Sequence, residues 1–231
     1  MALSVTLGTL VTRCKQRSDQ EGTDGHIGDA NNEWKSLVSE VYGELHGAVS
    51  DAGARYFETE ATITATGDAS YALPASHLST IGIDYVVDTA GRRRDLAELM
   101  VQEQVHFAGE TGEAYLFTLS GSNIVFYPKP SSGTYKHLYI PQPTDYSTAA
   151  DATGVDCINN DGMAFIIWGV ASIALHKGEA NQQRAMLERD AAKERLVMWA
   201  INRAMTMPKR RVVTDWDQAQ RFDPADWRWS R

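Results

Sequence analysis

The stretch that decides the fold reads DGMAFIIWGVASIALHKGEANQQRAMLERDAAKERLVMWAINRAM over residues 161–205. Its first part, residues 163–175, is apolar at almost every position, and a helix that is apolar on all sides is a buried helix. After Gly178 the sequence turns polar, and it then regains an apolar stripe at the spacing of one helical face. The stripe consists of Ala185, Ala192, Leu196 and Trp199. The sequence therefore predicts two helices that meet at Gly178.

These two helices are each too apolar at one end for the surface of a monomer. The apolar run is about 13 residues long, whereas crossing a bilayer takes about 20, so we expect no membrane span. The pair then needs either a large core or neighbouring subunits. The candidates for packing between subunits are Phe165, Ile166, Trp168, Leu196 and Trp199.

The charge of the chain is distributed unevenly. The formal net charge of the 231 residues is −8, and residues 206–231 hold six Lys or Arg against four Asp, which leaves +2 there and −10 before them. An acidic body disfavours non-specific wrapping of DNA, because neutralising phosphates takes clustered cations. It is compatible with a protein that lines a path for DNA. Cys14 falls on an apolar helical stripe, which indicates a packed, reduced thiol and a protein made in a reducing cytoplasm.

The remaining pattern predicts an α+β fold with helical ends. The strongest periodicity predicts a helix at Trp34, Leu37, Val38, Val41, Tyr42 and Leu45. Residues 56–143 are β-rich, with a hairpin at Gly121-Ser-Asn. Asp95 and Glu98 resemble a capping box and predict a short helix that carries Leu96, Leu99, Met100 and Val105. We divide the chain into N-terminal helices (1–55), a β-rich insertion (56–143), a C-terminal helix pair (144–207) and an extended tail (208–231).

The tail is unusually rich in aromatic residues. They are Trp216, Phe222, Trp227 and Trp229. A solvated tail is expected to be polar, whereas Trp and Arg are enriched among binding hot spots. The tail either packs back on its own domain or docks on another chain, and we favour docking.

Few residues of the sequence are candidates for catalysis or metal binding. Six dispersed histidines show no metal-ligand spacing, so we expect no metal and no cofactor. Glu58 and Glu60 form a crude carboxylate pair of the kind used in glycoside cleavage, although solvated strand charges explain them better. The basic run Arg92-Arg93-Arg94 has the charge for phosphate contact if it lies on a turn. It is otherwise a solvated hairpin tip paired with Asp88, Asp95 or a neighbouring subunit's acids.

Across residues 30–205 the order of features resembles the head-to-tail adaptor, or connector, proteins of tailed bacteriophages. The first long helix of that family resembles Trp34-x-x-Leu37-Val38-x-Glu40-Val41-Tyr42-x-Glu44-Leu45. Its β insertion resembles Tyr71-x-Leu73-Pro74, Ile81-x-Ile83, Gly91-Arg92 and Leu96, followed by Ala114-Tyr115, Ile124 to Pro128-x-Pro130 and Tyr135 to Pro141. Its apolar helix resembles Met163 to Ala174.

This resemblance implies a dodecameric ring beneath the portal protein, with genomic DNA passing through its centre without sequence-specific binding. It implies a virion protein at the head-tail interface, in contact with the portal and with tail or nozzle proteins. The C-terminal tail would then dock on the portal through Arg210, Arg211, Trp216, Phe222, Trp227, Trp229 and Arg231. Arg92, Arg93 and Arg94 would contact either the DNA channel or a neighbouring subunit.

The sequence thus favours a structural adaptor without catalysis. Two other functions stay open at this point. One is a virion-associated cell-wall glycosidase, whose only candidate acids are Glu58 and Glu60. The other is a DNA-binding packaging factor that depends on Arg92 to Arg94, for which a steep dependence of DNA affinity on salt would be expected.

Overall fold

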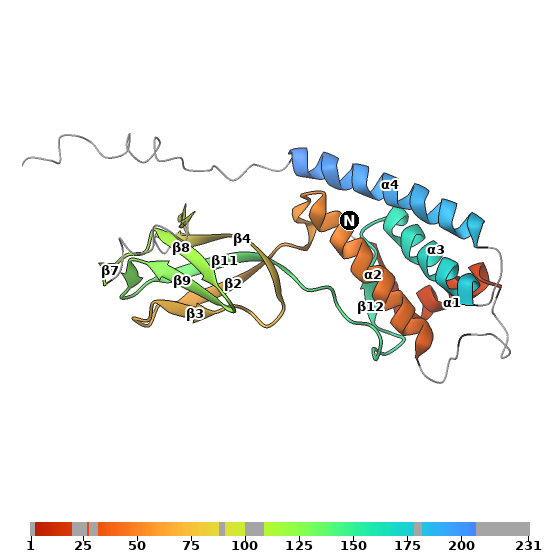
Figure 1. Ribbon diagram of the computed structural model, residues 1–231, viewed down its shortest axis with the longest axis horizontal. Coiled ribbons are helices and arrows are strands. Elements are labelled where there is room, and N and C mark those ends of the chain that lie inside the picture. The colour runs from red at the N-terminus through yellow and green to blue at the C-terminus, as the bar shows by residue number, and fades with distance from the viewer. Residues whose placement is uncertain are drawn as a thin grey trace, which may run out of the picture. The chain divides into compact units, whose positions relative to one another are not determined.

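The computed structural model describes residues 3–19, 27, 32–87, 91–99, 109–177 and 182–206 (Figure 1). The described residues divide into a helical unit, from Met1–Phe57 and Gln142–Met207, and a β unit, from Glu58–Pro141. This mixture of helices and sheets agrees with the α+β class expected from the sequence. Within the described part of the chain, every helix is too short or too polar to cross a membrane.

The helical unit is built from both ends of the chain. Its helices are α1 (Leu7–Arg17), α2 (Glu33–Asp51), α3 (Asn160–Lys177) and α4 (Gln183–Thr206). Its shorter elements are the 3-10 turn η1 (Arg55–Phe57) and the strands β1 (Ser4–Thr6) and β12 (Gly154–Asp156). Strand β1 pairs antiparallel with β12, so backbone hydrogen bonds join the N-terminal segment to the segment before α3.

Helix α3 lies at the centre of this unit. It packs against α1, α2 and α4, which is why its apolar residues run all round it (Figure 1). Two glycines permit the close approach. A Cβ atom at Gly169 would lie 2.6 Å from Cγ1 of Val41 on α2, and one at Gly162 would lie 2.2 Å from the carbonyl oxygen of Cys157. The periodic face of α2 predicted from the sequence is buried here as expected.

The β unit contains two four-stranded sheets that share one core. The first has the order β2-β11-β4-β5 and consists of β2 (Thr59–Thr64), β11 (Thr134–Pro141), β4 (His77–Val86) and β5 (Arg93–Asp95). The second has the order β3-β9-β8-β6 and consists of β3 (Ser70–Ala72), β9 (Asn123–Tyr127), β8 (Leu116–Ser120) and β6 (Ala97–Glu98). A short parallel pair joins β7 (Thr111–Gly112) and β10 (Lys129–Pro130). Buried side chains from both sheets meet in the core: Ile83, Phe117, Ile124, Phe126 and Tyr135.

The hairpin expected around Gly121 is confirmed. Strands β8 and β9 pair antiparallel from Ser120 opposite Asn123 back to Leu116 opposite Tyr127. Gly121 has a φ of +58°, in the left-handed region that glycine adopts most easily.

The prediction that a helix begins at Asp95 was wrong for residues 95–99, which the structure describes. Asp95 ends β5, and the next residues form β6. The backbone N–H of Leu96 donates to the carbonyl of Ile83, and the N–H of Leu99 donates to that of Phe117. Strand pairing therefore satisfies the backbone and buries both leucine side chains, and this outweighs the local capping signal. Met100 and Val105, the other residues of the expected helix, lie outside the described residues.

Candidate functional site

The basic run that was a candidate for DNA contact lies largely in a strand rather than on a turn. Arg93 and Arg94 belong to β5, and Arg92 is exposed just before it. The guanidinium of Arg93 lies 2.6 Å from Oε2 of Glu60. That of Arg94 lies 2.5 Å from Oε1 of Glu113, above the ring of Tyr85. The two arginines are thus neutralised within one chain, which reduces their availability for phosphates.

Glu60 is the centre of a charged row across the first sheet. It is paired with Arg93 and, at 3.0 Å, with Nζ of Lys136 on β11. The hydrogen bond from Lys136, followed by that from Arg93, holds the pKa of the Glu60 carboxyl below its usual range. A general acid for glycoside cleavage needs the opposite shift. The electrostatics of Glu60 therefore favour a strand ion pair over the glycosidase reading.

Three of the five candidates for packing between subunits are buried within a single chain. Phe165, Ile166 and Leu196 have no exposed surface, because α1, α2 and α4 surround α3. No neighbouring subunit is needed to cover them. The first of the two alternatives, a large core within one chain, accounts for the burial of these three residues.

The two tryptophans among those candidates are partly buried. Trp168 lies on α3 with the guanidinium of Arg17 at 5.1 Å from its ring. Trp199 lies on α4 in an edge contact with Tyr56, and Arg203 lies over its ring. Both indoles keep some contact with solvent, so they are available to a partner.

The residues expected to bind the portal lie outside the described residues. They are Arg210, Arg211, Trp216, Phe222, Trp227, Trp229 and Arg231. The last described residue is Thr206, at the end of α4.

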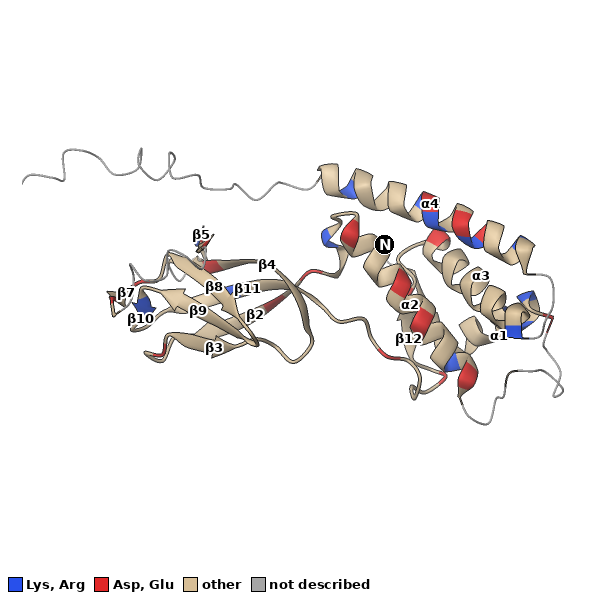
Figure 2. Cartoon of the chain, viewed as in Figure 1, with Lys and Arg blue, Asp and Glu red and all other residues tan. Residues whose placement is uncertain are grey.

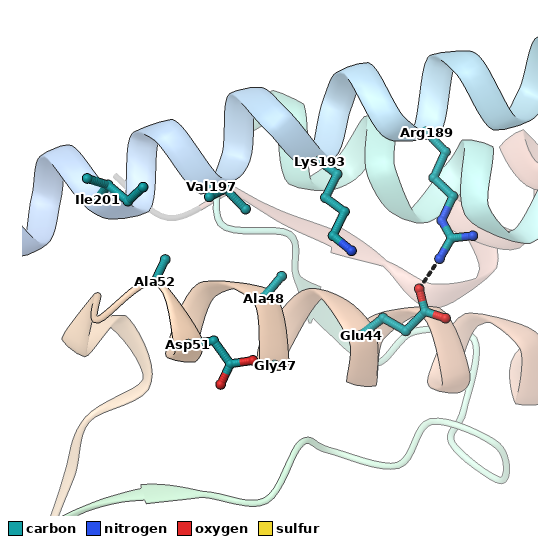
Figure 3. Close-up of a pocket in the computed structure, with 9 residues that line it drawn as sticks. All are labelled: Glu44, Gly47, Ala48, Asp51, Ala52, Arg189, Lys193, Val197 and Ile201. Carbon is teal, nitrogen blue, oxygen red and sulfur yellow. Dashed lines mark hydrogen bonds and ion pairs between the residues drawn. The ribbon is translucent and has the colours of Figure 1, made fainter.

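A groove between α2 and α4, which the sequence reasoning missed, is drawn in Figure 3. Its volume is about 640 Å³. Its apolar lining consists of Gly47, Ala48 and Ala52 of α2 and Val197 and Ile201 of α4. The small residues near the end of α2 are the only sequence signal for it.

Charged groups lie along the same groove. An ion pair between Glu44 and Arg189 crosses it at one end (Figure 3). Lys193 points toward α2, and Asp51 lies further along (Figure 3). The groove thus combines an apolar floor with charged side chains at its edge.

The outward face of α4 is the second feature that the sequence reasoning missed. Leu187, Met198 and Met205 are 71%, 57% and 72% exposed. They are 11 and 7 positions apart, three and two helical turns, and therefore share one face. This face lies opposite the buried stripe of Ala185, Ala192, Leu196 and Ala200. Exposed apolar side chains aligned on one helix face are candidates for contact with a partner.

Cys14, Cys157, His77 and His137 are placed in the interiors of the two units or in contact with them. Cys14 and Cys157 are free and buried, and burial raises the pKa of each thiol to about 12, which keeps them unreactive. His77 and His137 stack in the β unit and share the hydroxyl of Thr80. Among the described residues, no three His, Cys, Asp or Glu side chains converge to hold a metal.

The candidate features are thus a groove and an exposed helix face, both in the helical unit. A comparison with known protein families indicates the kind of protein that carries them. The model of a family described as SU10 adaptor protein matches residues 5–221. The chain belongs to the SU10 adaptor protein family. None of the curated proteins matches it.

Membership of the SU10 adaptor family confirms the resemblance to the head-to-tail adaptors of tailed bacteriophages. The chain is a bacteriophage adaptor protein, a structural component of the virion. The match includes the helical unit, the β unit and the first part of the tail.

Proposed function

We propose that this adaptor forms a homo-oligomeric, dodecameric ring that joins the portal to the tail and surrounds the path of the DNA. The observation that carries the proposal is the family match over residues 5–221. The outward apolar stripe of α4 supports it independently, because a monomer would leave these side chains in water.

We assign a different role to each part of the chain. The helical unit forms the ring, residues 208–231 order on the portal, and the β unit contacts the next tail component. The ring assembles in the host cytoplasm before it becomes part of the virion.

The acidic balance of the chain suits a DNA path without tight binding. A net charge of −8 repels phosphates, and the ion pairs of Arg93 and Arg94 reduce the positive charge offered to them. Tight phosphate binding would oppose ejection of the genome.

Docking of the tail has an entropic cost, because it orders the backbone of each residue that docks. Burial of large apolar side chains offsets part of this cost. Trp216, Trp227 and Trp229 are the residues of the tail with the most apolar surface to bury.

Co-sedimentation with purified portal rings tests the proposal. The full chain is expected to sediment with the portal, and a chain lacking residues 209–231 is expected to stay behind with its fold intact. A variant with Trp216, Trp227 and Trp229 replaced by serine should behave like the deletion. A variant with Arg210 and Arg211 replaced by glutamine separates the effect of charge from that of the indoles. Unchanged sedimentation of the deleted chain would reject the docking role of the tail.

A further inference from the structure

The outward face of α4 carries acids as well as apolar residues. Asp190 and Glu194 are exposed and follow Leu187 by 3 and 7 positions, so they lie on the same face as Leu187 and Met198. Neither carboxylate is paired with a cation of the described residues. The face therefore offers a mixed apolar and acidic surface to a partner.

A surface of opposite character lies between α1 and α3. Helix α1 carries Arg13, Lys15 and Arg17 and no acidic residue (Figure 2). Arg13, Gln16 and Arg17 line a groove of about 540 Å³ together with Met163 and Trp168 of α3. This α1/α3 groove joins basic side chains to apolar ones.

Arg13 and Arg17 of the α1/α3 groove contact a sulfur atom and an aromatic ring rather than carboxylates. The guanidinium of Arg13 donates to Sδ of Met163 at 2.9 Å, and that of Arg17 lies 5.1 Å from the Trp168 ring. Within the part of the chain that the structure describes, neither forms an ion pair. Arg and Trp together are the composition typical of an interface hot spot.

The two surfaces also match in spacing. Arg13 and Arg17 are four residues apart on α1, and Asp190 and Glu194 are four residues apart on α4. Four residues span about 6 Å along a helix axis. Two helices laid side by side would thus bring each carboxylate opposite one guanidinium.

We infer that the outward face of α4 of one copy docks in the α1/α3 groove of the next copy around the ring, an inference that rests on the proposed function. Asp190 and Glu194 face Arg13 and Arg17, and the apolar part of the α4 face covers Met163 and Trp168. Because the two surfaces use different residues, the contact is heterologous and can close into a ring. A DNA backbone would match the arginines, but it would leave the acidic and apolar face of α4 without a partner.

Charge reversal tests the pairing. The first variant carries Arg13→Glu and Arg17→Glu, and the second carries Asp190→Arg and Glu194→Arg. Each is expected to lose the ring mass in light scattering while its circular dichroism and thermal midpoint stay close to those of the wild type. A chain with Glu188→Arg, which alters an exposed acid on another side of α4, should assemble normally.

Recombining the reversed surfaces restores the complementarity. A chain with all four reversals is expected to regain the ring, and so is an equal mixture of the two variants, because each groove then meets a face of opposite charge. Assembly unaffected by either variant, or absence of rescue in folded chains, overturns the inference while the ring itself stands. Loss of DNA binding without loss of assembly overturns it in favour of a phosphate partner. A wild-type chain that is monomeric both alone and with portal contradicts the proposed function instead.

Discussion

The β unit and the helical unit differ in the surface feature that stands out in each, paired charges in the first and exposed apolar side chains on α4 in the second. The β unit pairs its prominent charges within one chain, through Glu60 with Arg93 and Lys136 and through Arg94 with Glu113. The helical unit buries the centre of α3, including Phe165 and Ile166, but leaves Leu187, Met198 and Met205 exposed on the outward face of α4. A chain can thus bury its core alone and still expose a face suited to a partner. In the proposed ring, the exposed face of α4 makes the contact, and the buried residues of α3 do not.

The largest change in the free energy of unfolding is expected from a substitution in the buried core around α3. Replacing Phe165 by alanine removes a fully buried ring from the core around α3 and should lower the free energy of unfolding by about 3–5 kcal/mol. Leu187→Ala, on the exposed face of α4, should change the monomer's stability by less than about 0.5 kcal/mol. Urea denaturation of both variants measures this contrast. Equal losses would mean that the two faces of the helix pair are equally buried.

A second substitution tests the close approach of α3 to its neighbours. Gly162→Ala places a Cβ atom against the carbonyl oxygen of Cys157, a backbone atom that cannot rotate away. Such overpacking should cost about 3 kcal/mol. Gly47→Ala is the matched control, because nothing lies within 4 Å of its Cβ position in α2, and it should be neutral or stabilising. Thermal unfolding separates the two, and a stable Gly162→Ala chain would contradict the packing described.

The β unit is expected to be sensitive to acid through His137. Burial, followed by the neighbouring His77, lowers the pKa of its imidazole from 6.5 to about 4, so the folded state favours the neutral ring. The unfolded state then binds more protons between these values, and stability is full above pH 6.5 and falls as the pH drops toward 4. The loss should be on the order of 2–3 kcal/mol.

Denaturation from pH 7 to pH 4 measures this loss. A His137→Phe chain, which has no proton to bind at this site, should show a flatter profile over the same range. His77 and His46, whose pKa values are also lowered by burial, are retained in that chain and contribute to the remaining slope. An unchanged profile in the His137→Phe chain would assign the acid sensitivity elsewhere.

The smallest effect is expected on the charged row of the β unit. Glu60→Gln removes the partner of Arg93 and Lys136 at a partly exposed site and should cost less than about 1 kcal/mol, with the difference shrinking in high salt. Glu98→Gln on β6 is the control for loss of an exposed carboxylate. If the wild type cleared peptidoglycan and the Glu60→Gln chain did not, the result would support the glycosidase hypothesis instead.

Local periodicity was sufficient to predict the main helices and the hairpin. The apolar residues from Trp34 to Leu45 form the buried face of α2, and the glycine at position 121 connects β8 and β9. Each signal is contained within the element that it predicts, so no distant residue is needed to read it.

The features that depend on distant residues could not be predicted in this way. The capping box at Asp95 was overridden by the carbonyls of Ile83 and Phe117, which come from other strands. Arg93 finds its carboxylate at Glu60, 33 residues earlier, rather than at Asp88 or Asp95. The burial of Phe165 was predicted correctly. Whether this chain or another copy buries it depends on how α1, α2 and α4 pack, which local sequence does not reveal.

The decisive measurement of ring formation is the mass of the full chain in solution, obtained by light scattering alone and with portal rings. Each portal ring is expected to gain the mass of many adaptor copies. A chain that stays monomeric and adds no mass to the portal would contradict a ring-forming adaptor and leave the outward face of α4 unexplained.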